Sequence, residues 1–286
     1  MPALKLIECP RDALQGLPSF IPTATKTAYL NALLRVGFDT LDFGSFVSPK
    51  AIPQLRDTAE VLAGLDLSAT NTRLLAIVAN RRGAETAAQH PEISYLGFPL
   101  SVSETFQQRN THQTRAGALA DVATMHELCE RVGKTLVAYL SMGFGNPYGD
   151  PWSPALIVDF TGQLAALGVR VVAPSDTVGA GTAATVGALF AELIPAFPSI
   201  EFGAHLHTLP TAWRANVAAA YRAGCRRFDG TLGGYGGCPM AADGLTGNVA
   251  TENLISYLGE QGEELRLDLG ALQAAQALSA AVFAAH

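Results

Sequence analysis

The sequence is poor in charged side chains and has no long uninterrupted apolar run. Charged residues make up 15% of its 286 residues and hydrophobic residues 49%, a balance that excludes a disordered chain and supports a large core. The formal net charge of −6 lacks the basic excess that nucleic-acid binding usually shows. Because no apolar run reaches membrane-spanning length, we expect neither a nucleic-acid nor a membrane partner.

Cysteine is scarce, and its four residues form no CxxC pair and no zinc-finger spacing. The first residues, Met1 to Ile7, lack the charged segment and long apolar run of a secretory signal. Cysteines in a chain without an export signal are normally reduced, so we expect a cytoplasmic protein. Cys9, Cys129 and Cys225 are expected to be buried and inert.

Short β-rich runs alternate with helical stretches along nearly the whole chain. The eight predicted strands are Leu4–Glu8, Thr40–Phe43, Leu74–Ala79, Ile93–Phe98, Thr135–Ser141, Val169–Ala173, Ile200–His205 and Arg226–Asp229. Alanine- and leucine-rich segments between them predict helices, among them Ala116–Val132, Ser153–Leu167 and Ala212–Ala223. Strands that alternate with helices indicate a parallel sheet, and eight such units favour a closed barrel over an open sheet.

We therefore predict an α/β protein, a single catalytic (β/α)8 TIM barrel over residues 1–286. Residues 259–286 are expected to form a C-terminal helical extension packed on the barrel, with a helix at Leu269–Ala284. Its high alanine content is typical of a helix that packs closely, either on its own chain or on a second subunit.

Polar side chains follow many of the predicted strands. They include Arg11, Asp12, Asp42, Ser45, Asp176, His205, His207 and, in a glycine-rich loop after the eighth strand, Cys238. Every strand of such a barrel opens with its carboxyl end on the same face, where active sites are built. Residues more than two hundred positions apart are therefore expected to converge there.

Two histidines on one strand predict a metal site. His205 and His207 are two residues apart, so the alternation of a strand points both rings to the same side. Asp12 is expected to lie nearby, because the first strand of a closed barrel neighbours the eighth, and Asn248 follows the eighth strand. Two nitrogen and two oxygen ligands suit Mg²⁺ or Mn²⁺, with Co²⁺ or Zn²⁺ as alternatives. The competing interpretation is a pair of ordinary strand-end histidines.

Five collinear motifs, spread from about residue 4 to residue 258, make the chain resemble the hydroxymethylglutaryl-CoA (HMG-CoA) lyases, a metal-dependent family. They are Pro10-Arg11-Asp12-Ala-Leu-Gln15, Gly44-Ser45-Phe46-Val47-Ser48-Pro49-Lys50, Ser175-Asp176-Thr177-Val178-Gly179, His205-x-His207, and Gly233-Gly-Tyr-Gly-Gly-Cys238-Pro239 followed by Gly247-Asn248.

The resemblance implies a role for each matching residue. Asp12, His205, His207 and Asn248 would hold Mg²⁺ or Mn²⁺. Arg11 would stabilise an enolate, and Cys238 would be the acid/base of a mobile lid. A small CoA thioester would be the substrate, and a homodimer or homotetramer the assembly.

The implied reaction is the retro-Claisen cleavage of 3-hydroxy-3-methylglutaryl-CoA, or a related 3-hydroxyacyl-CoA, to acetyl-CoA and a keto acid. A divalent cation acidifies a hydroxyl, a guanidinium stabilises developing negative charge, and a thiol can carry the final proton. We expect Asp42 and Asp176 to support these groups, one of them as an alternative base. Further residues are expected to face the substrate: Gln15, Ser45, Thr177, Gly236 and Gly237.

Four positions depart from the family pattern. Ile7 replaces an acidic residue, Val137 an arginine, Thr208 an aspartate and Leu17 a polar residue. Ile7 and Val137 together suggest either an ion pair replaced by apolar packing or a remodelled substrate pocket. The alternatives to HMG-CoA cleavage are another branched 3-hydroxyacyl-CoA, a pyruvate-type aldolase or Claisen condensing enzyme, and a metal-binding barrel without activity.

Overall fold

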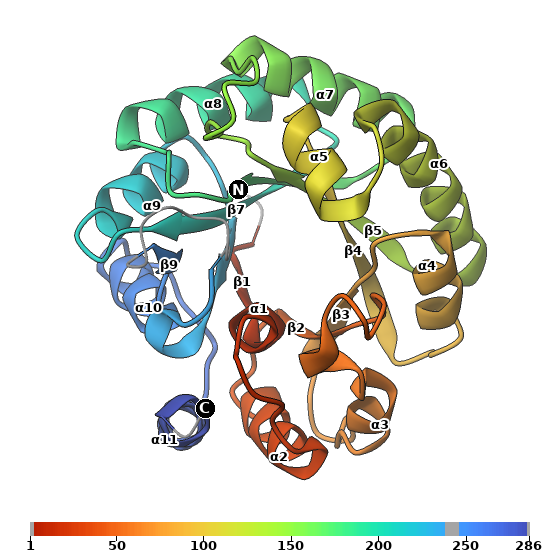
Figure 1. The fold of residues 1–286 in the computed structure, drawn as a ribbon. Coiled ribbons are helices and arrows are strands. Elements are labelled where there is room, and N and C mark those ends of the chain that lie inside the picture. Colours follow the sequence, from red (N-terminus) through yellow and green to blue (C-terminus); the bar gives the residue numbers. More distant parts are fainter. Residues whose placement is uncertain (1–2, 238–245, 285–286) are drawn as a thin grey trace.

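A ring of eight parallel strands forms the centre of the molecule, and helices surround it (Figure 1). The computed structural model describes residues 3–237 and 246–284. The ring consists of β1 (Lys5–Glu8), β2 (Thr40–Ser45), β3 (Arg73–Ile77), β4 (Ile93–Ser101), β5 (Thr135–Ser141), β6 (Val171–Asp176), β7 (Glu201–Thr208) and β8 (Arg227–Gly230). Each strand pairs with the next, and β1 pairs with β8, so the barrel is closed.

Helices connect the strands, and most of them cover the outside of the barrel. They are α1 (Pro10–Gln15), α2 (Thr23–Leu34), α3 (Thr58–Ala63), α4 (Arg81–Ala88), α5 (Glu104–Thr111), α6 (Arg115–Val132), α7 (Pro154–Ala166), α8 (Ala183–Ala196), α9 (Trp213–Arg222), α10 (Thr251–Glu260) and α11 (Leu269–Ala284). Two short 3-10 helices, η1 (Pro53–Leu55) and η2 (Leu232–Gly234), and the two-residue strand β9 (Gly247–Asn248) complete the described elements. In this part of the chain, none of the helices has the length and apolar character that crossing a membrane requires.

The (β/α)8 barrel and its C-terminal helix are confirmed, whereas several predicted strand boundaries are wrong by two or three residues. β4 continues to Ser101, since Pro99, although it lacks an N–H, still pairs in register with Tyr139. β6 begins at Val171, since the N–H of Val169 still donates to the carbonyl of Leu164 at the end of α7. β7 runs on to Thr208, so His205 and His207 both lie within the strand.

The inside of the barrel is apolar on one half and polar on the other. Side chains of β3 to β6 form a buried inner cluster: Leu75, Ile77, Tyr95, Val137, Tyr139, Val171 and Ala173. β7 and β8 contribute His205, Arg227 and Asp229, all buried. Ile7 and Val137 are completely buried, and neither lines the cavity described below. This placement favours the interpretation that apolar packing replaced an ion pair.

The helix α11 lies beside α2 (Figure 1) and contacts the start of the glycine-rich loop. The ring of Phe283 packs edge-on against Tyr29 of α2 and stacks on Tyr235, with centroids 4.3 Å apart. The hydroxyl of Tyr29 also lies 3.3 Å from that of Ser279. The C-terminal helix is thus joined to the segment that leads into the predicted lid.

Candidate active site

Arg11 is held in one orientation by its neighbours on α1 and β2. Proline at the first helical position starts α1 directly after β1, since its fixed φ suits that position and its missing N–H costs nothing there. The guanidinium donates from Nε and Nη2 to Asp42, at 2.9 and 2.6 Å, and from Nη1 to Asp12 and Gln15, both at 2.9 Å. These four bonds use four of the five N–H donors of arginine, which leaves one N–H on Nη2.

Asp42 lies fully buried behind Arg11. Burial raises its pKa to about 6, although the charge and hydrogen bonds of Arg11 act in the opposite direction. Its Oδ1 atom has no hydrogen-bond partner among the described residues. Such a pKa would suit a general base, but Asp42 is absent from the residues found to line the cavity. Its position therefore fits support of Arg11 better than direct proton transfer.

In both His205 and His207 the ring nitrogen Nδ1 lies next to an oxygen, which leaves Nε2 for a cation. Nδ1 of His207 lies 3.2 Å from the carbonyl oxygen of Thr177, and Nδ1 of His205 lies 3.1 Å from Asp229 Oδ2. An oxygen acceptor at Nδ1 places the proton on that nitrogen, so the lone pair of each neutral ring is on Nε2. Nε2 of His207 is buried and lacks a hydrogen-bond partner in the described part of the chain.

Asp12 completes a group of ligands with the two histidines. One ligand atom from each of the three residues lies within 4.8 Å of the others, and all three side chains are buried. Burial alone would raise the pKa of Asp12, but the charge of Arg11 is the largest opposing effect, and that pKa lies well below its usual range. An ionised carboxylate and two imidazole lone pairs fit a divalent cation, because the lone pair of His207 would otherwise stay buried and unpaired.

Asn248 lies beside Asp12, but it presents its amide nitrogen. Nδ2 donates to Asp12 Oδ2 at 2.6 Å and to the carbonyl oxygen of Tyr235 at 3.1 Å. The strand β9 brings it there, since Asn248 pairs with His207 in antiparallel register. The structure therefore places all four residues of the predicted metal site together, with the amide oxygen of Asn248 turned away from Asp12.

A cavity of about 360 Å³ opens beside this group. Its polar side includes Arg11, Asp12, Gln15, Ser141, Ser175, Thr177, His205, His207 and Gly237. Its apolar side includes Val47, Ile52, Ile77, Ala79, Pro99 and Phe106. Among the described residues that line the cavity, Arg11 is the only arginine or lysine.

Other predicted site residues face away from the cavity or bond elsewhere. The carboxylate of Asp176 accepts the backbone N–H groups of Ala180 and Gly181, both at 2.8 Å, and so closes the loop after β6. The hydroxyl of Ser45 accepts the N–H of Val47. Gly236 packs against the backbone of Asp12 and Ala13, where a Cβ atom would lie 2.8 Å from the carbonyl oxygen of Asp12. Cys238 lies outside the described residues.

Sequence reasoning missed Asp229, whose carboxylate fixes the ring of His205. The hydrogen bond and charge of Asp229 raise the pKa of His205, against the opposing effect of burial. A carboxylate behind a metal-ligating imidazole sets its tautomer and orientation. The sequence could have indicated this role, because Asp229 lies near the end of the eighth predicted strand, where an inward-pointing side chain reaches the mouth of the barrel.

Glu8 is not part of the candidate site, but it makes the stability of the folded protein depend on pH. It points to the outer face of β1, where its carboxylate accepts the N–H of Leu232 and the hydroxyl of Thr251. Burial raises its pKa from 4.5 to about 8. Between pH 4.5 and about 8, Glu8 is protonated in the folded protein but ionised in the unfolded chain. The contribution of Glu8 to the free energy of unfolding is therefore present below pH 4.5 and is lost as the pH rises through about 8.

We therefore expect Glu8→Gln to match the wild type in thermal stability near pH 5 and to exceed it at pH 8.5. Glutamine keeps the shape, can accept from Leu232 and donate to Thr251, and cannot ionise. Melting temperatures at both pH values check this. An unchanged difference between the two proteins across that range would contradict the assignment.

The fold and the ligand group define a class of protein, a (β/α)8 barrel with a buried group of side chains at its mouth that could hold a metal ion. A family model described as HMGL-like matches residues 4–278, and the chain therefore belongs to that family. The hydroxymethylglutaryl-CoA lyase YngG of Bacillus subtilis is 34% identical over 252 residues, which cover 88% of this chain and 83% of that protein.

Two further comparisons found other lyases. The (R)-citramalyl-CoA lyase of Chloroflexus aurantiacus is 30% identical over 285 residues, 96% of this chain and 89% of that protein. The structure of an HMG-CoA lyase from Acinetobacter baumannii, solved with coenzyme A and 3-methylmalate, superposes with a TM-score of 0.89 at 31% identity. That comparison covers 98% of this chain and 91% of the other.

Proposed function

We propose that the protein is a carbon–carbon lyase that cleaves 3-hydroxy-3-methylglutaryl-CoA, or a related 3-hydroxyacyl-CoA, to acetyl-CoA and a keto acid. The observation that carries this proposal is the placement of Arg11 beside Asp12, His205 and His207 at one end of the cavity. Family membership and the two lyase relatives support the same reaction class.

Arg11 is the residue proposed to stabilise the enolate. The cleavage leaves negative charge on the thioester oxygen, and a permanently charged guanidinium stabilises such charge. Asp42, Asp12 and Gln15 hold four of its N–H groups, so the remaining one is available to the substrate without reorganisation. Asp42 is proposed to act through Arg11, and Asp176 through the loop that it closes.

Asp12, His205, His207 and Asn248 are proposed to hold Mg²⁺ or Mn²⁺, with Co²⁺ or Zn²⁺ as alternatives. When bound, the cation supplies Lewis acidity to the oxygens of the substrate. Asn248 joins the ligands if its amide turns by half a rotation, which exchanges Nδ2 for Oδ1 next to Asp12. Asp229 and the carbonyl of Thr177 hold the two imidazoles with Nε2 facing the cation.

The final proton transfer is assigned to Cys238, which lies outside the described residues. Gly236 and Gly237 have φ values of +85° and +127°, a backbone conformation that suits glycine, so the chain can pass close to Asp12 before it reaches the cysteine. Gln15, Thr177 and Gly237 line the cavity and are proposed to contact the substrate. Ser45 is proposed to support the neighbouring loop.

The assembly and the surroundings are also part of the proposal. A homodimer or homotetramer follows from the family resemblance. The three described cysteines, Cys9, Cys129 and Cys225, are free thiols, which is the state maintained in a reducing compartment such as the cytoplasm.

A panel of CoA thioesters tests the substrate. We expect the purified enzyme with Mn²⁺ to release acetyl-CoA from HMG-CoA. A longer uncharged branch at C3 should raise kcat/KM by up to about fourfold per methylene, because Val47, Ile52 and Ile77 line the cavity and a buried methylene contributes about 0.8 kcal/mol.

Cys238→Ala should nearly abolish cleavage. Retained activity in that variant would favour an aldolase, and no release from any thioester would refute the lyase.

A further inference from the structure

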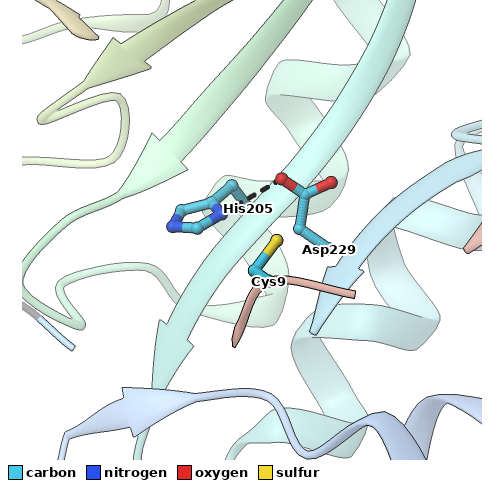
Figure 2. Close-up of side chains that lie close together, drawn as sticks. All are labelled: Cys9, His205 and Asp229. Carbon is cyan, nitrogen blue, oxygen red and sulfur yellow. Dashed lines mark hydrogen bonds and ion pairs between the residues drawn. The ribbon is translucent and has the colours of Figure 1, made fainter. Parts of the chain in front are cut away.

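A second group of metal-ligating side chains lies next to His205, on the Nδ1 side of its ring (Figure 2). It combines Cys9, which lies between β1 and α1, with His205 from β7 and Asp229 from β8. One ligand atom from each lies within 4.8 Å of the others, and all three residues are buried. In Figure 2 the thiol points towards the hydrogen-bonded ring nitrogen and carboxylate.

We propose that Cys9, His205 and Asp229 form a second cation site, which takes a thiophilic divalent cation such as Zn²⁺ or Cd²⁺ and thereby stops catalysis. The binding part of this inference is independent of the proposed lyase function, and the inhibitory part rests on it.

The donor set separates the two sites by the kind of cation that each prefers. Thiolate, imidazole and carboxylate are common ligands of four-coordinate zinc, whereas Mg²⁺ prefers oxygen ligands and nearly ideal octahedral geometry. On binding, the thiol of Cys9 releases one proton to solvent, and the proton on Nδ1 of His205 moves to Nε2, so that the ring binds through Nδ1 as a neutral imidazole. The cation then takes the place of the Nδ1 proton between His205 and Asp229, and a water molecule fills the fourth position.

The charges around this site favour a cation. Asp229, Asp42 and Asp12 act on Cys9 together with Arg11, and Arg227 acts on Asp229. The site is therefore surrounded by three carboxylates and two guanidinium groups, so negative charge is in excess. Asp229 also has a spare acceptor, because its Oδ1 is buried and has no hydrogen-bond partner within the part of the chain that the structure describes.

Occupation of the second site would affect the first through the shared imidazole. His205 belongs to both groups of ligands, and its Nδ1 already bonds to Asp229. A cation on Nδ1 removes the hydrogen bond that orients the ring and places a second double positive charge close to the first. Both effects weaken the binding of Mg²⁺ or Mn²⁺.

Cadmium alone is the probe for binding, because a cadmium–thiolate bond gives an ultraviolet charge-transfer band that oxygen and nitrogen ligands do not. The protein used is Cys238→Ala, so that the loop cysteine contributes no signal. Titration with Cd²⁺ in the presence of excess Mg²⁺ should give the band at one equivalent per chain.

Two variants in this background decide which thiol binds. Adding Cys9→Ser should abolish the band, and adding Cys9→Ala should do the same if the serine variant fails to fold. Cys225→Ser is the matched control, because Cys225 is also a buried free thiol and donates to the carbonyls of Phe202 and Arg227. It should leave the band unchanged. No band, or a band that survives loss of Cys9, would overturn the site.

Inhibition is measured on the enzyme with Cys238 intact. Cys9→Ser should raise the Zn²⁺ concentration that halves the rate by about tenfold or more, which corresponds to about 1.4 kcal/mol of binding free energy. Equal sensitivity of both proteins to Zn²⁺ would refute the inhibitory role. If the wild type cleaves no thioester, the proposed function fails while the charge-transfer experiment still tests the site.

Discussion

His207→Ala is expected to lower kcat by about 10³-fold or more and to abolish stoichiometric binding of Mn²⁺. The ring supplies a buried Nε2 lone pair whose Nδ1 proton already bonds to the carbonyl of Thr177. A cation contributes several kcal/mol to transition-state stabilisation, and 4 kcal/mol corresponds to about 10³-fold in rate. Equilibrium dialysis with Mn²⁺ and the rate of acetyl-CoA release measure the two effects.

His126→Ala is the matched control for that variant. His126 lies on α6, close to Gly168, and is not part of the ligand group. Alanine is a good helix former, so the control should keep both its Mn²⁺ stoichiometry and its kcat. Binding of one Mn²⁺ per chain in His207→Ala, with kcat near that of the wild type, would show that the cation is bound elsewhere.

Arg11→Met is expected to lower kcat by about 10²–10³-fold, the usual cost of removing one group that stabilises an oxyanion. Arg11→Lys should recover little of this loss. A lysine keeps the charge, but its compact ammonium cannot donate to Asp42, Asp12 and Gln15 at once. KM should change much less than kcat, because the interaction strengthens as the enolate forms.

Arg115→Met controls for the general loss of an arginine. Arg115 donates to Glu104 and to the carbonyl of Val102 and does not line the cavity, so its replacement should leave kcat unchanged. If Arg11→Lys retained kcat within about threefold of the wild type, the fork geometry of Arg11 would have no catalytic role.

The positions of the two histidines were predictable because the alternation along one strand is a local property. The closed barrel then explains why Asp12, nearly two hundred residues earlier, lies beside them. Asn248 could be placed near the same point, but the direction of its amide could not. That direction depends on the carbonyl of Tyr235 and on Asp12, which belong to separate segments.

The residues that hold these side chains in place were harder to predict, since their positions depend on the register between strands. Asp229 bonds to His205 because β7 and β8 pair with these two residues opposite each other, and no pattern in either strand reveals that pairing. Asp176 is at the expected strand end, yet its carboxylate turns to the N–H groups of Ala180 and Gly181. The backbone path of that loop decided its orientation.

The most direct test of the account is to titrate the chelator-treated, cation-free enzyme with Mn²⁺ while acetyl-CoA release from HMG-CoA and its branched analogues is measured. We expect no release without the cation and a rise that reaches its plateau at one equivalent of Mn²⁺ per chain. Full activity in the chelated protein, or one Mn²⁺ bound per chain without cleavage of any thioester, would contradict it.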